Sequence, residues 1–119
     1  MNRRKTGTEW EQTASAYLAR KGMRIVTVNF RCRQGEIDLI GYHNGYLVFV
    51  EVKYRTGTEK GYALEAVDRR KQRKICRVAD YYRYLHGLGD GVGVRYDVVG
   101  IQGGDIQWIQ NAFQHIYAN

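Results

Sequence analysis

Residues 35–54 read GEIDLIGYHNGYLVFVEVKY, and this stretch decides the fold. Asn44-Gly45 lies between two runs rich in β-branched and aromatic residues. This dipeptide favours a type I′ turn, because both central residues of that turn need a positive φ. The turn places His43 opposite Tyr46. The sequence therefore predicts a β-hairpin whose register is fixed by its turn.

The predicted register brings charged side chains together at the open end of the hairpin. Counting outward from the turn, Asp38 lies opposite Glu51 and Glu36 lies opposite Lys53. Because side chains alternate between the two faces of a strand, these charged residues share a face with two apolar ones, Ile40 and Phe49. The other face carries a second apolar set: Ile37, Leu39, Val48, Val50 and Val52. Both faces are apolar near the turn, so we expect a central hairpin that is covered on both sides.

Two carboxylates that face each other across a sheet, with Cβ atoms roughly 5 Å apart, repel unless something positive lies between them. A divalent cation such as Mg²⁺ suits Asp38 and Glu51, because it takes one or two carboxylates and keeps several waters. Lys53 would then orient or deprotonate a water, or stabilise a phosphate. A purely structural alternative stays open, in which Lys53 bridges to Glu36 and an arginine neutralises the two acids.

Asp38, followed by Glu51-Val52-Lys53 on the next strand, resembles the D…E-x-K signature of the PD-(D/E)xK nuclease superfamily. A longer pattern resembles the YraN family of small, poorly characterised bacterial proteins over nearly the whole chain. That family is itself similar in layout to archaeal Holliday junction resolvases. Trp10 is a departure, because the family usually has glycine there. The pattern comprises Glu11-x-x-Ala14-x-x-Tyr17-Leu18, Asn29-Phe30-Arg31, Gly35-Glu36-Ile37-Asp38-Leu39-Ile40, Phe49-Val50-Glu51-Val52-Lys53, Glu65-Ala66-Val67, Lys71, Lys74-Ile75 and Tyr96-Asp97-Val98-Val99.

This resemblance implies magnesium- or manganese-dependent hydrolysis of phosphodiester bonds in DNA, with branched or structured DNA favoured. It also implies a homodimer, since junction resolvases act as dimers. The implied metal ligands are Asp38, Glu51, the carbonyl of Val52 and Glu11. The implied catalytic residues are Asp38, Glu51 and Lys53, with Glu36 and Lys71 in support. The alternative function is a non-catalytic nucleic-acid-binding module on the same fold, and a requirement for metal would discriminate between the two.

The role of Glu11 is open from the sequence. Thr8-Glu9-Trp10-Glu11 is a capping-box pattern, which predicts that the first helix begins with Thr8 as its N-cap and that Gly22 ends it. In that interpretation Glu11 is the capping glutamate. In the family resemblance it is a carboxylate of the site, and the two roles are compatible.

A long helix is predicted over Ala63–His86, because apolar residues recur at spacings of three and four. Lys71 interrupts this apolar stripe, so it either extends past the edge of the core or points at the site. Five basic residues on the polar face form the predicted nucleic-acid-binding surface: Arg69, Arg70, Arg73, Lys74 and Arg77. A basic helix face is often merely solvated, but here Asp68 is the single acid nearby.

The order of predicted elements is helix, three-strand meander, long helix and two strands. This is an α/β arrangement, α-β-β-β-α-β-β, similar to the restriction-endonuclease-like core with a mixed sheet of about five strands flanked by helices. The long helix is long enough for a crossover, so the strand Val94–Ile101 is expected to be parallel to its neighbour. Asp97 on that strand is interpreted as structural.

Composition narrows the class of protein. The 119 residues suit a single domain, and a net charge of +7 with a pI near 9.6 favours an anionic partner. Nucleic acid fits best, and the resemblance to the nucleases implies DNA more than RNA. Cys32 and Cys76 lack metal-ligand spacing, and no signal peptide or membrane span is evident, so we expect a cytoplasmic protein. Residues 1–7 are polar and basic and are predicted to form a mobile arm.

Overall fold

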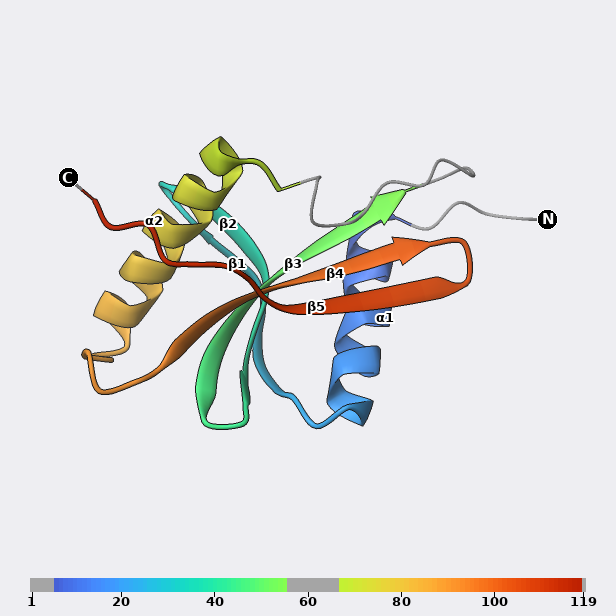
Figure 1. Ribbon diagram of the computed structural model, residues 1–119, viewed down its shortest axis with the longest axis horizontal. Coiled ribbons are helices and arrows are strands. Elements are labelled where there is room, and N and C mark those ends of the chain that lie inside the picture. Colours follow the sequence, from blue (N-terminus) through green and yellow to red (C-terminus); the bar gives the residue numbers. More distant parts are fainter. Residues whose placement is uncertain (1–5, 56–66, 119) are drawn as a thin grey trace.

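The computed structural model describes residues 6–55 and 67–118, which form a five-stranded mixed sheet with one helix on each face (Figure 1). The sheet keeps the strands in chain order, β1-β2-β3-β4-β5. β3 and β4 are parallel, and the other neighbours are antiparallel. The predicted α/β order and the parallel crossover are therefore confirmed. The elements are α1 (Gly7–Arg20), β1 (Arg24–Cys32), β2 (Gly35–His43), β3 (Tyr46–Arg55), α2 (Arg69–Leu85), β4 (Val94–Gln102) and β5 (Asp105–Phe113).

The central hairpin has the predicted turn and register near its tip. Asn44 and Gly45 have φ values of 51° and 82°, as a type I′ turn requires. The ladder runs from His43 opposite Tyr46 to Leu39 opposite Val50 and ends there. Beyond this point the prediction is wrong, because Asp38 and Glu51 are not ladder partners, and neither are Glu36 and Lys53.

The ladder ends because β2 and β3 each follow their other neighbour. Glu36 of β2 lies opposite Arg31 of β1, whereas Glu51 and Lys53 of β3 lie opposite Val98 and Gly100 of β4. β1 and the start of β2 turn toward α2, while the ends of β3 and β4 and the start of β5 run past α1 (Figure 1). We call the opening between Asp38 of β2 and Glu51 of β3 the fork.

Each face of the sheet packs against one helix. Ile40 and Phe49 pack beneath α2, and Leu39, Val48 and Val50 pack beneath α1, as predicted. Ile37 is an exception, because it packs with the α2 cluster rather than with Leu39. The fork begins between these two residues, so the alternation of the paired hairpin does not extend to Ile37. The start of β2 thus lies close to α2: a Cβ atom on Gly35 would lie 3.4 Å from the side chain of Val78 of α2.

α1 begins earlier than its sequence pattern predicts, and α2 begins later. Thr6 is the N-cap of α1 and its hydroxyl accepts a hydrogen bond from Glu9 N at 3.2 Å, so Thr6 and Gly7 belong to the helix and not to the predicted arm. The rest of that arm, residues 1–5, lies outside the described residues. α2 begins at Arg69, directly after its N-cap Asp68. Of the start predicted for this helix, residues 63–66 lie outside the described residues. No helix within the described residues is long and apolar enough to cross a membrane.

Candidate functional site

Asp38 and Glu51 lie at the base of the fork, and both side chains are buried. Their exposed fractions are 8% and 6%. Asp38 Oδ2 accepts a hydrogen bond of 2.7 Å from the backbone N–H of Val52, so this side chain bridges the two separating strands. The predicted juxtaposition of the two acids is therefore present, although a side chain and not the backbone ladder produces it.

Two lysines converge on Glu51. Lys53 Nζ and Lys71 Nζ each lie 3.5 Å from Glu51 Oε1, Lys53 from the same strand and Lys71 from the first turn of α2. The interpretation that Lys53 bridges to Glu36 is thus wrong, and within residues 6–55 and 67–118 no arginine forms an ion pair with Asp38 or Glu51. Lys71 points at the site rather than merely past the edge of the core.

Glu11 approaches Asp38 from α1. Because Thr6 and Glu9 occupy the capping positions, Glu11 is not the capping glutamate, and that interpretation is wrong. Trp10 stacks on Tyr54 with ring centroids 4.0 Å apart, and this contact fixes the first turns of α1 over β3. Glu11 Oε2 is buried without a hydrogen-bond partner among the described residues.

The electrostatics of the fork favour protonation or a bound cation. Burial raises the pKa of Asp38 from 3.8 to about 6; the hydrogen bond from Val52 opposes this rise, and the nearby Glu11 adds to it. Burial and the charge of Asp38 raise the pKa of Glu51, while Lys71 and Lys53 oppose the rise. Three carboxylates thus meet two lysines, and both lysines contact Glu51.

The donor set fits a hydrated hard cation and not a closed metal centre. No group of three or more His, Cys, Asp or Glu side chains within the described residues is arranged to hold a metal ion. Two carboxylates are nonetheless what Mg²⁺ usually takes from a protein, since it keeps several waters. Asp38 and Glu51 provide that pair, and the partnerless oxygen of Glu11 adds negative potential beside it.

Glu36 lies outside this cluster of contacts. Its Oε2 pairs with Arg31 Nε at 3.1 Å, and its side chain is 49% exposed. It still contributes to the raised pKa of Asp38, but as the weakest of the causes. The ladder with β1 accounts for this position, because it holds Glu36 opposite Arg31 and away from Lys53.

The predicted basic surface of α2 is present except for one member. Arg69, Arg70, Arg73 and Lys74 are exposed. Arg77 is different, because its guanidinium donates to the carbonyl of Ile116 and pairs with Asp80 at 3.2 Å. Arg77 therefore anchors the C-terminal segment, a role that depends on a contact 39 residues away and has no local signal.

A second buried acid lies elsewhere on the sheet and is fully paired. Asp97 accepts hydrogen bonds from Arg95 Nε at 2.9 Å, Arg95 Nη2 at 2.8 Å, Trp108 Nε1 at 2.9 Å and the backbone N–H of Asn111 at 2.9 Å. Its structural interpretation is confirmed by these contacts. We call Asp97 and its donors the Asp97 network.

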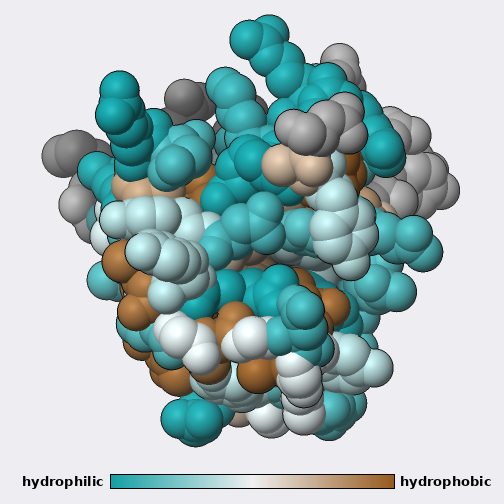
Figure 2. Space-filling view, turned by 90° about the vertical axis from the view of Figure 1, so that its left-hand side faces the viewer, coloured by the Kyte–Doolittle hydropathy of each residue, from teal (hydrophilic) through white to brown (hydrophobic). Residues whose placement is uncertain are grey.

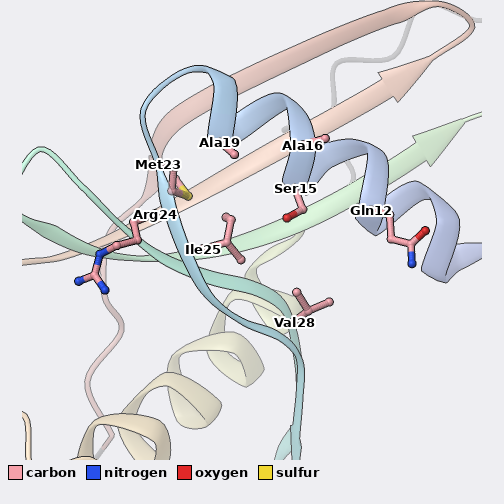
Figure 3. Close-up of a pocket in the computed structure, with 8 residues that line it drawn as sticks. All are labelled: Gln12, Ser15, Ala16, Ala19, Met23, Arg24, Ile25 and Val28. Atoms are coloured by element: carbon pink, nitrogen blue, oxygen red, sulfur yellow. The ribbon is translucent and has the colours of Figure 1, made fainter.

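The groove between α1 and β1 has different chemistry (Figure 3). Its volume is about 510 Å³, and its one charged lining residue is Arg24. It contains no carboxylate, so it is not the candidate site. The other lining residues are Gln12, Ser15, Ala16, Ala19, Met23, Ile25 and Val28.

Comparison with known proteins gives a family without an assigned activity. Residues 10–101 match the model of a family described as "Uncharacterised protein family UPF0102". The chain is 46% identical over 113 residues to a "UPF0102 protein" of Lachnoclostridium phytofermentans, covering 95% of this chain and 96% of that one. It is 44% identical over 108 residues to a "UPF0102 protein" of Aeromonas hydrophila subsp. hydrophila, covering 90% and 83% respectively.

Proposed function

The chain belongs to the uncharacterised protein family UPF0102, and from the chemistry of the fork we propose that it is a metal-dependent endonuclease that hydrolyses phosphodiester bonds in DNA. The observation that carries this proposal is the buried pair Asp38 and Glu51 with Lys53 and Lys71 beside it. A buried acid that has few donors is unfavourable for stability, so its presence at the fork supports a functional role.

Asp38 and Glu51 are the residues that would hold Mg²⁺ or Mn²⁺, with the carbonyl of Val52 as a further ligand implied by the resemblance. When bound, the cation supplies electrostatic stabilisation for the negative charge that develops on the phosphate. Glu11 would act on this site through its charge, because it contacts Asp38 and one of its buried oxygens has no donor among the described residues.

The two lysines provide the positive groups that a phosphodiester needs. Lys53 is partly buried and is held by Glu51, so its ammonium group has a defined position from which it can donate to a phosphate oxygen or orient the attacking water. Lys71 is 40% exposed and reaches the fork from the start of α2. It can therefore contact a strand that lies across the fork.

The exposed basic residues of α2 would bring the polyanion to the fork. Arg69 and Arg70 lie in the same first turn as Lys71, and Arg73 and Lys74 continue the surface. Such a surface gains from counterion release, so affinity should fall steeply with salt. The preference for branched DNA and the homodimer are proposals that rest on the resemblance to junction resolvases.

A cleavage assay tests this function. Labelled single-stranded, duplex and four-way branched DNA would be incubated with the protein in Mg²⁺, Mn²⁺ or EDTA. We expect metal-dependent cleavage that falls at least about a hundredfold in Asp38→Asn and in Lys53→Ala, and that is unchanged in the control Asp105→Asn, which alters an exposed acid at the start of β5. DNA binding without cleavage in every metal would instead favour the non-catalytic binding module.

A further inference from the structure

The outer face of α2 changes from basic to aromatic along its length. Arg69, Arg70, Arg73 and Lys74 occupy its first half, and Tyr81, Tyr84 and Leu85 follow in its second half, with exposed fractions of 36%, 80% and 51%. Figure 2 views the molecule from the side of α2, and hydrophilic side chains cover much of the upper part of this face. An 80% exposed tyrosine gains nothing from the core, so its ring is available to a partner.

Helical spacing joins the basic and aromatic parts into one stripe. Lys74, Arg77, Tyr81 and Tyr84 follow one another at intervals of three, four and three residues, and residues at these intervals are neighbours on a helix surface. Tyr81 leans toward Phe30 of β1, with ring centroids 6.5 Å apart, whereas Tyr84 makes no ring contact within the described residues. Tyr84 is therefore the most accessible ring of the stripe.

The C-terminal segment places another tyrosine beside this stripe. His115 Nδ1 lies 2.6 Å from the hydroxyl oxygen of Tyr96, and His115 Nε2 lies 3.3 Å from Asp80 Oδ1 of α2. The ring of Tyr117 contacts the ring of His115 at 4.7 Å and is 81% exposed. Two exposed tyrosines, from separate segments, thus lie on the same side of the molecule.

The charge of the stripe selects the class of partner. The acidic residue beside the stripe is Asp80, and both Arg77 and His115 contact its carboxylate. Arg69, Arg70, Arg73 and Lys74 form no ion pair with another described residue. A polyanion complements this surface, and rings beside the positive charges suit one whose subunits carry planar groups.

We propose that this stripe binds unpaired bases of a nucleic acid strand, with its phosphates on Arg70, Arg73 and Lys74 and its bases stacked on Tyr84 and Tyr117. The proposal rests on the proposed function for its partner class and adds that the substrate carries a single-stranded segment. Bases in a continuous duplex cannot offer their faces to a side chain, whereas an unpaired base stacks on an aromatic ring with about 1–3 kcal/mol. By helical rise, Tyr84 lies ~20 Å along α2 from Lys71, so this segment flanks the fork and does not enter it.

Binding measured in EDTA tests the stripe separately from cleavage. The probes are a labelled single-stranded oligothymidine and a blunt duplex of equal length. We expect Tyr84→Leu to weaken single-strand binding about tenfold and to leave duplex binding nearly unchanged. Tyr84→Phe, which keeps the ring, should bind like the wild type. Tyr46→Leu is the control for the loss of an exposed tyrosine, because Tyr46 is 44% exposed and lies at the start of β3, outside the stripe.

The outcomes separate this proposal from the nuclease proposal. Unchanged binding in Tyr84→Leu, or an equal loss for single strand and duplex, would overturn the base-stacking role even if the wild type cleaves DNA. A loss of self-association in light scattering without a change in single-strand binding would identify a protein interface and would also overturn it. A selective loss of single-strand binding would support it even if no metal produces cleavage.

Discussion

Two buried acidic sites on the same sheet have opposite surroundings. Asp97 receives four hydrogen bonds, two of them from the charged Arg95. Within residues 6–55 and 67–118, Asp38 has one backbone donor, the N–H of Val52, and its other neighbours include two carboxylates, Glu11 and Glu51. Burial alone therefore does not distinguish the two sites, whereas the number of donors does.

The difference has an energetic meaning. Hydrogen bonds to a charged group contribute about 1.5–3 kcal/mol each, so the Asp97 network holds β4 and β5 together and needs nothing further. At the fork both lysines contact Glu51, whereas Asp38 forms no ion pair within the described residues, so we expect its charge to lower stability until a cation binds. The Asp97 network should therefore be sensitive to substitution, and the fork should tolerate the loss of a charge.

The largest expected effect comes from neutralising Asp97. Asp97→Asn should destabilise the protein by about 3–5 kcal/mol, because it leaves the buried Arg95 without its charged partner. Urea denaturation would measure the change, with Asp38→Asn as the matched variant. A loss below about 1 kcal/mol for Asp97→Asn would remove the contrast between the two sites.

The next effect is a dependence of stability on pH that arises at the fork. The folded pKa of Asp38 is raised from 3.8 to about 6, so the folded state binds more protons than the unfolded state between these values. Stability should fall by about 3 kcal/mol in total as pH rises from below the unfolded pKa to above the folded one, and about 2 kcal/mol of this fall should occur between pH 4 and 6. The raised pKa of Glu51 acts in the same direction.

Denaturation in EDTA at a series of pH values would measure this fall as the difference between the wild type and Asp38→Asn. The comparison is needed because burial lowers the pKa of His115, which makes stability rise with pH over part of the range in both proteins. A difference that is flat from pH 4 to 7 would contradict the electrostatics described for the fork.

A smaller effect separates Glu11 from Glu36, two acids near Asp38. Glu11→Gln should weaken Mn²⁺ binding several-fold with little loss of stability, because Thr6 and Glu9 cap the helix without it. Glu36→Gln should change Mn²⁺ affinity less than twofold, since Glu36 is exposed and paired with Arg31. Isothermal titration calorimetry would measure the Mn²⁺ affinity of both variants and of the wild type. Equal Mn²⁺ affinities of Glu11→Gln and the wild type would exclude Glu11 from the site.

The hairpin was predictable from the sequence, and the fork was not. Asn44-Gly45 determines a type I′ turn locally, and the register follows from it as far as Leu39 and Val50. Whether β2 and β3 stay paired beyond that point depends on their competing neighbours β1 and β4, which the hairpin sequence does not contain. The sequence therefore predicted correctly that Asp38 and Glu51 lie together. It attributed this to a ladder pair, whereas the side chain of Asp38 bridges to the backbone of Val52.

The start of α1 and the partners of Asp97 and Arg77 could not be predicted from the sequence for the same reason, because they depend on contacts between residues that are distant in sequence. Thr6-x-x-Glu9 and Thr8-x-x-Glu11 both fit a capping box, so the local pattern does not choose between them, and the packing of Trp10 on Tyr54 is a tertiary contact. The donors of Asp97 that lie on β5 and the carbonyl that binds Arg77 are likewise distant in sequence.

The most direct test of the account is the stability of the wild type and of Asp38→Asn with and without Mg²⁺ or Mn²⁺. We predict that the metal stabilises the wild type, by about 2.7 kcal/mol at a hundred times its dissociation constant. Asp38→Asn should show no metal response, and its metal-free stability should be equal to that of the wild type or higher by about 1 kcal/mol. A destabilised Asp38→Asn together with a metal-insensitive wild type would contradict the account, because the fork would then be structural like the Asp97 network.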